Sequence, residues 1–252
     1  MRLYGLIGRK LGHSFSKRYF EAKFAAENRS DCCYELFELP DISNLRDFVC
    51  NHPDLQGLNV TIPYKQSVMA LLDAVDPEAE QVGAVNTIRV FRDNGNVELV
   101  GFNTDVEGFR LSLAGKRIPS RALVLGTGGA AAAVAHVLRQ WGVPFRQVSR
   151  HPENDEISYL QVSDSVLQDY PFVINCTPSG MYPAVEEKPQ LPYEALTANC
   201  FLYDLVYNPE KTLFLKEGEK RGAQIQNGME MLRLQAEASW KIWNGAKRTE
   251  CL

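Results

Sequence analysis

The stretch RALVLGTGGAAAAVAHVLRQW, residues 121–141, decides the fold expected for this chain. Residues 121–125 form an apolar run of strand length, residues 126–129 a glycine-rich turn, and residues 130–141 an alanine-rich helix. A further apolar run at residues 145–149 supplies the next strand. The segment therefore predicts a complete strand–helix–strand unit with parallel strands, which is the building block of an α/β domain.

The turn in this unit, Gly126-Thr127-Gly128-Gly129-Ala130 with Ala131 after it, fits the pattern G-x-G-x-x-A. Glycine permits the tight turn and lets the backbone approach a pyrophosphate, whose charge is met by the free N–H groups at the start of the helix. Between a strand and a helix the pattern predicts a dinucleotide site. The alternative interpretation is an ordinary packing turn.

The end of the following strand indicates which dinucleotide binds. An acidic side chain there would accept hydrogen bonds from a ribose 2′-hydroxyl, but the chain has Ser149-Arg150-His151 and no acid before Glu153. A guanidinium matches a 2′-phosphate with charge-assisted hydrogen bonds, so the sequence favours NADP. Arg150 could otherwise be a solvated loop residue.

Strands alternate with helices along the rest of the chain, which predicts an α/β protein. Further strands are expected at residues 3–8, 33–39, 57–62, 85–91, 97–102, 172–176 and 200–205. Further helices are expected at residues 16–26, 42–50 and 64–74, from near Asp105, and as an amphipathic helix over residues 228–243. Asp93-Asn94-Gly95 signals a hairpin, so the first sheet should be mixed.

The composition excludes several classes of protein. The chain has 252 residues, 45% of them hydrophobic, and a formal net charge of −4, which suits globular domains and leaves no basic surplus for nucleic acid. No apolar run is long enough to span a membrane and no signal-peptide pattern is seen, so we expect a cytoplasmic protein. The six cysteines form no C-x-x-C pair, so we expect reduced thiols and no metal.

Polar residues cluster around the strand at residues 57–62. Alternation places Asn59 and Thr61 on one face at its carboxyl end, where α/β folds bind ligands. Lys65 follows in the first turn of the expected helix, where it could transfer protons or be an ordinary exposed lysine. Asn86 could be a turn residue or a ligand for a hydroxyl group.

Hydroxyl and acidic residues at two other helix starts also have two interpretations. Thr104 and Glu107 fit a capping box, which leaves Asp105 as an acid in the first turn with either a structural or a chemical role. Ser14 and Ser16 could be helix-start hydroxyls, or they could donate hydrogen bonds to a substrate carboxylate.

Taken together, eight segments in order resemble the shikimate dehydrogenase family. They are GLIG at 5–8 with HSFS at 13–16, NVTIPYK at 59–65, GAVNT at 83–87, GFNTD at 101–105, the glycine turn, NCTPSGM at 175–181, DLVYNP at 204–209, and the helix from Gly228 through Met231-Leu232 to Gln235. The match runs over nearly the whole chain.

The resemblance implies an N-terminal mixed-sheet substrate domain at 1–104, a Rossmann-like NADP-binding domain at 105–228, and a C-terminal helix at 229–252 that returns to the substrate domain. It also implies an oxidoreductase of aromatic amino-acid biosynthesis that transfers hydride reversibly between the C3 hydroxyl of shikimate and NADP, giving 3-dehydroshikimate. Its partner would be this small substrate, and the protein would be a monomer or a homodimer.

By the same resemblance, each part of the site is assigned to specific residues. The catalytic pair would be Lys65, which handles the hydroxyl proton, and Asp105, which orients Lys65 and binds the substrate. Substrate-binding residues would be Ser14, Ser16, Asn59, Thr61, Asn86, Tyr207 and Gln235. Cofactor-binding residues would be Gly126, Thr127, Gly128, Gly129, Ala130, Ser149, Arg150, Thr177 and Gly228.

Two other functions compete with this assignment. One is a broader dehydrogenase that accepts quinate as well as shikimate and uses NAD, against which Arg150 argues. The other is a catalytically silent NADP-binding sensor, which would not need Lys65 and Asp105 together.

Overall fold

The computed structural model describes residues 1–12 and 15–245, so the predicted substrate residue Ser14 lies outside the described part of the chain. Contacts divide the chain into two compact units. The first combines Met1–Glu107 with the chain from Gln235 onward, and the second is Gly108–Leu234. The chain passes between the units within helix α4, Thr104–Ser112, and within helix α8, Met229–Asn244, just after the boundaries expected from the sequence.

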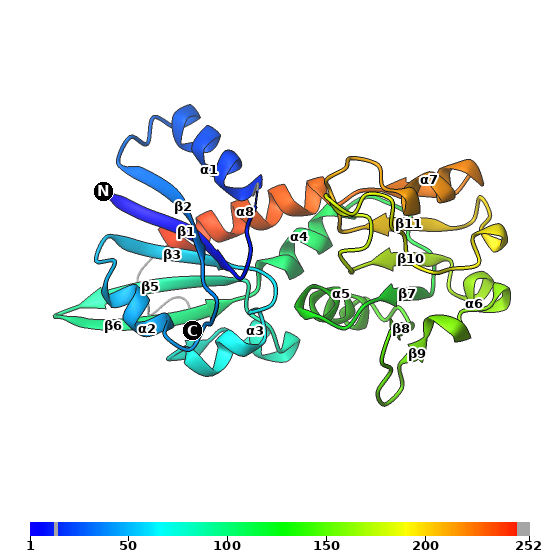
Figure 1. Cartoon of the computed structure of the whole chain (residues 1–252), viewed down its shortest axis with the longest axis horizontal. Coiled ribbons are helices and arrows are strands. Elements are labelled where there is room, and N and C mark those ends of the chain that lie inside the picture. The colour runs from blue at the N-terminus through cyan, green and yellow to red at the C-terminus, as the bar shows by residue number, and fades with distance from the viewer. Residues whose placement is uncertain (13–14, 246–252) are drawn as a thin grey trace. The chain divides into compact units, whose positions relative to one another are not determined.

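The first unit is built on a six-stranded sheet in the order β2-β1-β3-β5-β6-β4 (Figure 1). Its strands are β1 (Arg2–Gly8), β2 (Cys32–Glu38), β3 (Leu55–Val60), β4 (Ala74–Val75), β5 (Thr87–Asp93) and β6 (Asn96–Phe102). β1 pairs in parallel with β2 and β3, whereas β5 is antiparallel to both β3 and β6. The sheet is therefore mixed, and the predicted hairpin between β5 and β6 is confirmed.

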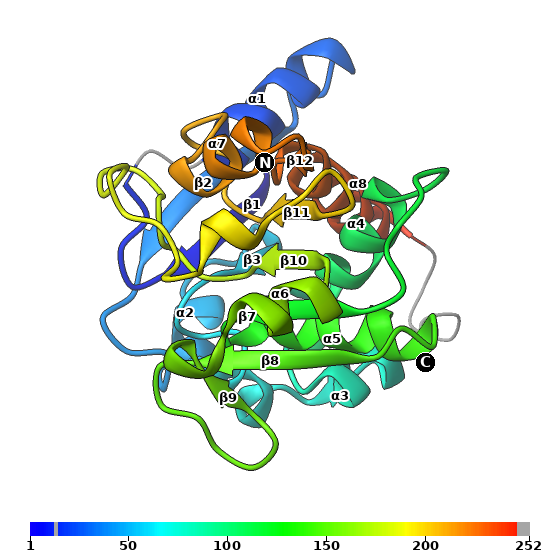
Figure 2. The same ribbon diagram turned by 90° about the vertical axis from the view of Figure 1, so that its right-hand side faces the viewer.

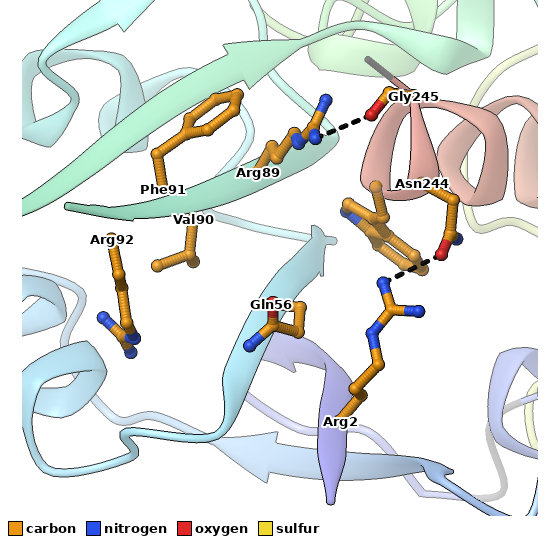
Figure 3. A pocket seen from close by; sticks show the side chains of 9 residues that line it. Arg2, Gln56, Arg89, Val90, Phe91, Arg92, Asn244 and Gly245 are labelled. Carbon is orange, nitrogen blue, oxygen red and sulfur yellow. Dashed lines mark hydrogen bonds between the residues drawn. The ribbon is translucent and has the colours of Figure 1, made fainter. Parts of the chain in front are cut away.

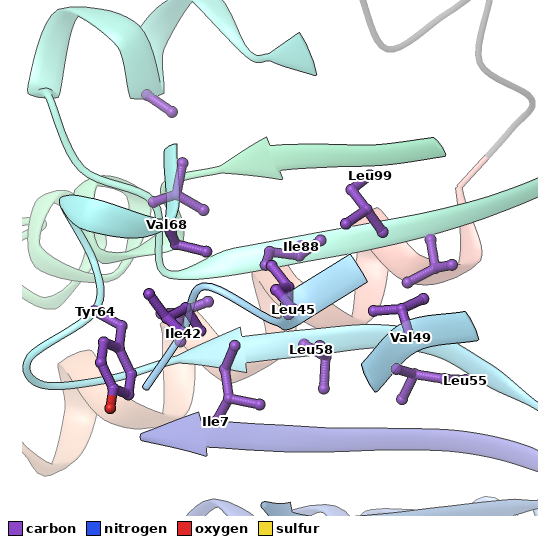
Figure 4. Packing of buried hydrophobic residues seen from close by; sticks show 14 residues of the cluster. Ile7, Ile42, Leu45, Val49, Leu55, Leu58, Tyr64, Val68, Ile88 and Leu99 are labelled. Atoms are coloured by element: carbon purple, nitrogen blue, oxygen red, sulfur yellow. The ribbon is translucent and has the colours of Figure 1, made fainter. Parts of the chain in front are cut away.

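Helices cover both faces of this sheet. On one face α1 (Phe15–Ala26) and α8 pack through Phe20, Trp240 and Trp243 onto Tyr4 of β1. On the other face α2 (Leu45–Cys50) and α3 (Pro77–Val82) cover an aliphatic cluster around Leu58 of β3 (Figure 4). The C-terminal helix therefore joins the core of the first unit.

The helix predicted over residues 64–74 is wrong. The structure has a turn, a short 3₁₀ helix at Ser67–Leu71 and then strand β4. Tyr64 and Val68 are both buried, and their spacing of four residues is typical of a helix. The carbonyl of Lys65, however, accepts a hydrogen bond from Val85 N–H at 2.7 Å and not from an N–H group of a following helical turn. Lys65 is therefore held by a neighbouring loop and does not lie in a helix.

The start of α4 also differs from prediction. Asn103, not Thr104, caps this helix, because its Oδ1 accepts a hydrogen bond from Val106 N–H at 3.3 Å. The predicted capping box of Thr104 and Glu107 is therefore wrong. The Thr104 hydroxyl is instead part of a buried side-chain network described below.

The second unit contains a six-stranded, all-parallel sheet in the order β12-β11-β10-β7-β8-β9 (Figure 2). The strands are β7 (Ala122–Leu125), β8 (Phe145–Ser149), β9 (Ile157–Ser158), β10 (Phe172–Asn175), β11 (Phe201–Asp204) and β12 (Gln224–Gln226). The helices are α5 (Gly129–Gln140), α6 (Asp164–Asp169) and α7 (Leu213–Lys220). This is the predicted Rossmann-like arrangement, with β9, β12, α6 and α7 added.

The core of this unit explains the sheet order. Leu123, Val173 and Leu202 come from adjacent strands and share one cluster with Leu167 of α6 and Phe214 of α7. On the opposite face, Tyr203 of β11 contacts Phe109 of α4 with ring centroids 5.3 Å apart. Since both faces are covered, the central strands β7, β10 and β11 are buried along their whole length, as is usual for parallel sheets.

Candidate functional site

The predicted catalytic pair is brought together in the first unit. Lys65 Nζ lies 2.6 Å from Asp105 Oδ2, and the two side chains are 16% and 8% exposed. The other carboxylate oxygen, Oδ1, accepts a hydrogen bond from Asn86 Nδ2 at 2.9 Å. Asp105 occupies the first turn of α4, where the helix dipole favours a negative charge. The ammonium group is therefore held by a carboxylate that is itself fixed at both oxygens.

Asn86 is the centre of the contacts on Asp105. Its Oδ1 accepts hydrogen bonds from Thr104 N–H at 2.7 Å and from the hydroxyls of Thr87 and Thr104 at 3.1 Å each. Its backbone N–H and carbonyl pair with Phe102 and Val60. The amide is thus locked with its NH₂ group toward Asp105, so Asn86 holds the carboxylate that pairs with Lys65.

A buried hydroxyl network connects α8 to this pair. Ser239 Oγ lies 2.8 Å from Thr87 Oγ1 and 3.1 Å from Thr104 Oγ1, and it accepts from Asn59 Nδ2 at 2.9 Å. Gln235, one turn earlier on the same helix, has its Oε1 3.5 Å from Thr104 Oγ1. Sequence reasoning missed Ser239 and Thr87. The spacing of four residues between Gln235 and Ser239 on one helix face would have indicated Ser239.

Tyr34 extends the network toward the start of α1. Its hydroxyl donates to Asn59 Oδ1 at 2.8 Å and is in hydrogen-bonding contact with Ser16. Complete burial raises the pKa of Tyr34, so the phenol stays neutral and keeps its donor. The first unit therefore brings Ser16, Asn59 and the pair of Lys65 and Asp105 into one connected polar cluster.

The contacts described above do not include two of the predicted substrate-binding residues, Thr61 and Tyr207. Thr61 follows β3 directly and is half-buried, with its methyl group against Gly8. Tyr207 is half-buried and belongs to the second unit. Their predicted roles in substrate binding stay predictions.

The glycine turn in the second unit has the shape that a dinucleotide needs. Gly126 has a φ of +104°, which favours glycine, and its N–H donates to Val148 O at 2.8 Å. A Cβ on Gly128, the N-cap of α5, would have no atom within 4 Å, so the space over the turn is open. The first N–H groups of α5 have no partner within the helix. Together these features form a cradle that fits a pyrophosphate.

The predicted adenosine end lies at the end of β8. Ser149 Oγ accepts from His151 N–H at 3.2 Å and donates to His151 O at 3.0 Å, which fixes the turn containing Arg150. Arg150 itself is exposed and available to an anionic ligand. This arrangement fits a 2′-phosphate, which an exposed guanidinium binds well.

Two further residues, Thr177 and Gly228, are predicted to bind the cofactor, and both lie against the backbone or turn of neighbouring segments. Thr177 Cγ2 lies 3.0 Å from where a Cβ on Gly126 would be. A Cβ on Gly228 would lie only 2.1 Å from the carbonyl oxygen of Leu205, so the chain requires glycine there for close backbone approach. Direct contact of either residue with NADP remains a prediction.

A separate pocket of about 370 Å³ lies in the first unit at the C-terminal end of α8 (Figure 3). Arg2 donates to Asn244 Oδ1 at 2.8 Å, and Arg89 donates to the Gly245 carbonyl at 2.9 Å. Cations stabilise the negative end of a helix dipole, so these arginines secure the end of α8. None of the predicted site residues lines this pocket.

Two properties of the described residues bear on other classes of function. Within residues 1–12 and 15–245, no helix combines the length and the apolar character needed to cross a membrane. In the same part of the chain, no three His, Cys, Asp or Glu side chains are grouped so that they could hold a metal ion.

A parallel-sheet unit with an open glycine turn, together with a unit that carries a buried lysine–aspartate pair, defines a nicotinamide-dependent oxidoreductase. Residues 6–88 match the family model for the shikimate dehydrogenase substrate binding domain. Shikimate dehydrogenase (NADP⁺) from Symbiobacterium thermophilum is 38% identical, over 98% of this chain and 90% of the relative. Its counterpart from Methanococcus maripaludis is 34% identical, over 98% and 93%. The chain belongs to the shikimate dehydrogenase family.

Solved structures agree with this assignment. The crystal structure of shikimate 5-dehydrogenase from Thermus thermophilus, in complex with NADP(H) and shikimate, matches with a TM-score of 0.84 and 30% sequence identity. The match covers 98% of this chain and 94% of that chain. The folds of both units therefore also occur in a dehydrogenase whose structure contains NADP(H) and shikimate.

Proposed function

We propose that this chain interconverts shikimate and 3-dehydroshikimate with NADP as the hydride carrier. The observation that carries the proposal is the buried pair of Lys65 and Asp105, with 2.6 Å between Nζ and Oδ2, in a chain that also has an open dinucleotide turn. The named activity of the family supports the same reaction. A silent NADP sensor has no need of such a pair.

Lys65 moves the hydroxyl proton in this proposal. In the oxidation of shikimate the neutral amine form of Lys65 accepts the C3 hydroxyl proton as the hydride leaves C3, and in the reverse direction the ammonium form returns a proton to the carbonyl oxygen of 3-dehydroshikimate. Asp105 Oδ2 holds Nζ in place, and Asn86 holds the carboxylate from its other side. Because the pair is largely buried, its electrostatic effect on a bound hydroxyl is little screened by water.

The polar network beside the pair binds the rest of the substrate. Ser14 and Ser16 would hold the carboxylate, while Asn59, Thr61, Asn86 and Gln235 would hold the ring hydroxyls, with Tyr207 as a further contact. The connection from Ser16 through Tyr34 to Asn59 supports this division of roles. These contacts orient the C3 carbon, and orientation alone contributes strongly to the rate.

The second unit would hold NADP, which supplies the hydride acceptor when bound. The glycine turn from Gly126 to Ala130 would bind the pyrophosphate, with Thr177 and Gly228 as further contacts. Ser149 and Arg150 would bind the 2′-phosphate. The open space over Gly128 and the exposed guanidinium of Arg150 support this placement.

Turnover measured with four combinations of substrate and cofactor tests the proposal. Purified protein is assayed for nicotinamide reduction with shikimate or quinate, and with NADP or NAD. We expect turnover with shikimate and NADP to exceed all other combinations. Comparable rates with quinate or with NAD would indicate the broader dehydrogenase, and NADP binding without any turnover would indicate the sensor.

Replacing Arg150 tests the choice of cofactor. Arg150→Ala should lower kcat/KM for NADP about tenfold to a hundredfold, because one charge-assisted hydrogen-bond pair to the 2′-phosphate is lost. The value for NAD should change little. Arg146→Ala, an exposed arginine earlier on β8, is the matched control and should leave both values near wild type. Equal losses with both cofactors would contradict the proposed contact.

The proposal also covers the cellular location and the oligomeric state of the enzyme. The adjacent, partly buried thiols Cys32 and Cys33 suit a reducing compartment, so we assign the protein to the cytoplasm. We propose that it works as a monomer or a homodimer, since each chain contains both the catalytic pair and the dinucleotide turn.

A further inference from the structure

A buried carboxylate in the second unit has no part in the proposed reaction. Asp204 ends β11 and is fully buried. Its Oδ1 accepts from Asn175 Nδ2 and Val206 N–H, each at 3.0 Å, and its Oδ2 accepts from Thr212 Oγ1 at 2.6 Å. These partners are neutral, and burial raises the pKa of Asp204 to about 7. A buried carboxylate without a cation lowers the stability of the fold, so we looked for a functional role of Asp204.

The neighbouring strand shows where this carboxylate acts. Asn175 and Asp204 are paired residues at the ends of the parallel strands β10 and β11. A carboxylate can only accept hydrogen bonds, so it forces the NH₂ group of Asn175 toward itself and the amide oxygen away. That oxygen, Asn175 Oδ1, accepts from Thr177 N–H at 3.1 Å and from Thr177 Oγ1 at 2.6 Å. Asp204 thus favours the amide orientation that Thr177 requires, together with Ser179 O, a longer acceptor for Asn175 Nδ2 at 3.4 Å.

Thr177 passes this constraint to the dinucleotide turn. Its Cγ2 lies 3.0 Å from the Cβ position of Gly126, the first glycine of the turn. Thr177 in turn holds the residue two positions later, because its Oγ1 accepts a hydrogen bond from Ser179 N–H at 3.3 Å. The loop after β10 is therefore fixed against the turn by a chain of hydrogen bonds that begins at a buried charge.

We infer that Asp204 is a positioning residue for NADP, which orients the Asn175 amide and thereby holds Thr177 against Gly126 in the geometry that the cofactor binds. This inference rests on the proposed NADP site and adds a residue that does not itself touch the cofactor. It also assigns Asn175 a role as the intermediate in the relay.

Asp204→Leu tests the inference, because it removes the acceptor for Asn175 Nδ2 and keeps a side chain of similar size. NADPH affinity is measured from nicotinamide fluorescence at pH 8, without shikimate. We expect Kd to rise about tenfold. At saturating NADP, kcat and KM for shikimate should stay within about twofold of wild type, because Lys65, Asp105 and all the proposed substrate contacts except Tyr207 belong to the first unit.

Ser112→Ala is the matched control. Ser112 is buried in the same unit, and its hydroxyl lies 2.8 Å from that of Tyr203, next to Asp204 on β11 but outside the relay. It should lower the melting temperature while leaving NADPH affinity near wild type. Equal weakening of NADPH binding in Ser112→Ala and Asp204→Leu would mean general loosening of the unit and would overturn the inference, as would unchanged affinity in Asp204→Leu.

Asn175→Leu covers the case in which Asp204→Leu does not fold. It removes the middle residue of the relay, while Val206 N–H and Thr212 Oγ1 still donate to the Asp204 carboxylate. NADPH Kd should rise about tenfold, as in Asp204→Leu, and wild-type NADPH affinity in the folded Asn175→Leu protein would contradict the relay. Because binding is measured without shikimate, absence of shikimate turnover in the wild type would refute only the proposed reaction.

Discussion

Lys65→Ala is expected to lower kcat about a thousandfold, the effect of removing a general acid–base catalyst. The Nζ atom that lies 2.6 Å from Asp105 Oδ2 is lost, and water cannot replace it in the same position. NADPH affinity should stay near wild type, because the dinucleotide turn belongs to the second unit. Steady-state kinetics and NADPH fluorescence measure the two effects separately.

The control for this variant is Lys241→Ala, which removes a lysine that is 72% exposed and 3.8 Å from Glu107. An exposed pair at this distance contributes little, so both kcat and stability should be unchanged. Lys65→Ala also leaves Asp105 without its cation, so its thermal stability must be checked beside its activity. A folded Lys65→Ala protein with wild-type turnover would rule out proton transfer by Lys65.

The features that could be predicted from the sequence are those fixed by neighbouring residues. The glycine turn after β7 is one, because strand, turn and helix follow each other within residues 121–141. The hairpin at Asp93-Asn94-Gly95 is another, since the turn type requires these residues. Local backbone preference and periodicity carry this information without any tertiary contact.

Features decided by tertiary contacts were missed or wrong. Tyr64 and Val68 have helical spacing, yet Val85 captures the carbonyl of Lys65 and the chain continues into β4. Asn86 Oδ1 accepts a hydrogen bond from Thr104 N–H, and Asn103 rather than Thr104 caps α4 by accepting from Val106 N–H. In each case a partner distant in sequence supplied the hydrogen bond that the local pattern had assigned to a neighbour.

The site shows the same division. The motifs predict Lys65 and Asp105 as a catalytic pair, but nothing in the sequence shows that the pair is in contact or that Asn86 holds the other oxygen of the carboxylate. Ser239 lies 152 residues from Thr87, and their contact depends on α8 returning to the first unit. Motifs therefore indicate the reacting groups, whereas the groups that position them follow only from the packed structure.

Gly57→Ala is expected to lower the free energy of unfolding by about 3 kcal/mol, the upper range for inserting a methyl group into a packed core. The new Cβ would lie 2.2 Å from Trp243 Nε1 and 2.3 Å from Cδ1. The indole ring stacks on Tyr4 with centroids 5.0 Å apart and donates to Ile88 O at 3.0 Å, so moving it also breaks a buried hydrogen bond. Urea denaturation measures the loss.

The same substitution should reach the active site through α8. Trp243 anchors the helix that carries Gln235 and Ser239, so its displacement should raise KM for shikimate more than KM for NADP. Gly128→Ala is the opposite control, because its Cβ meets nothing within 4 Å: stability should be retained while NADPH affinity falls. If Gly57→Ala matches wild type in both stability and KM for shikimate, the packing of Trp243 does not control the positions of Gln235 and Ser239.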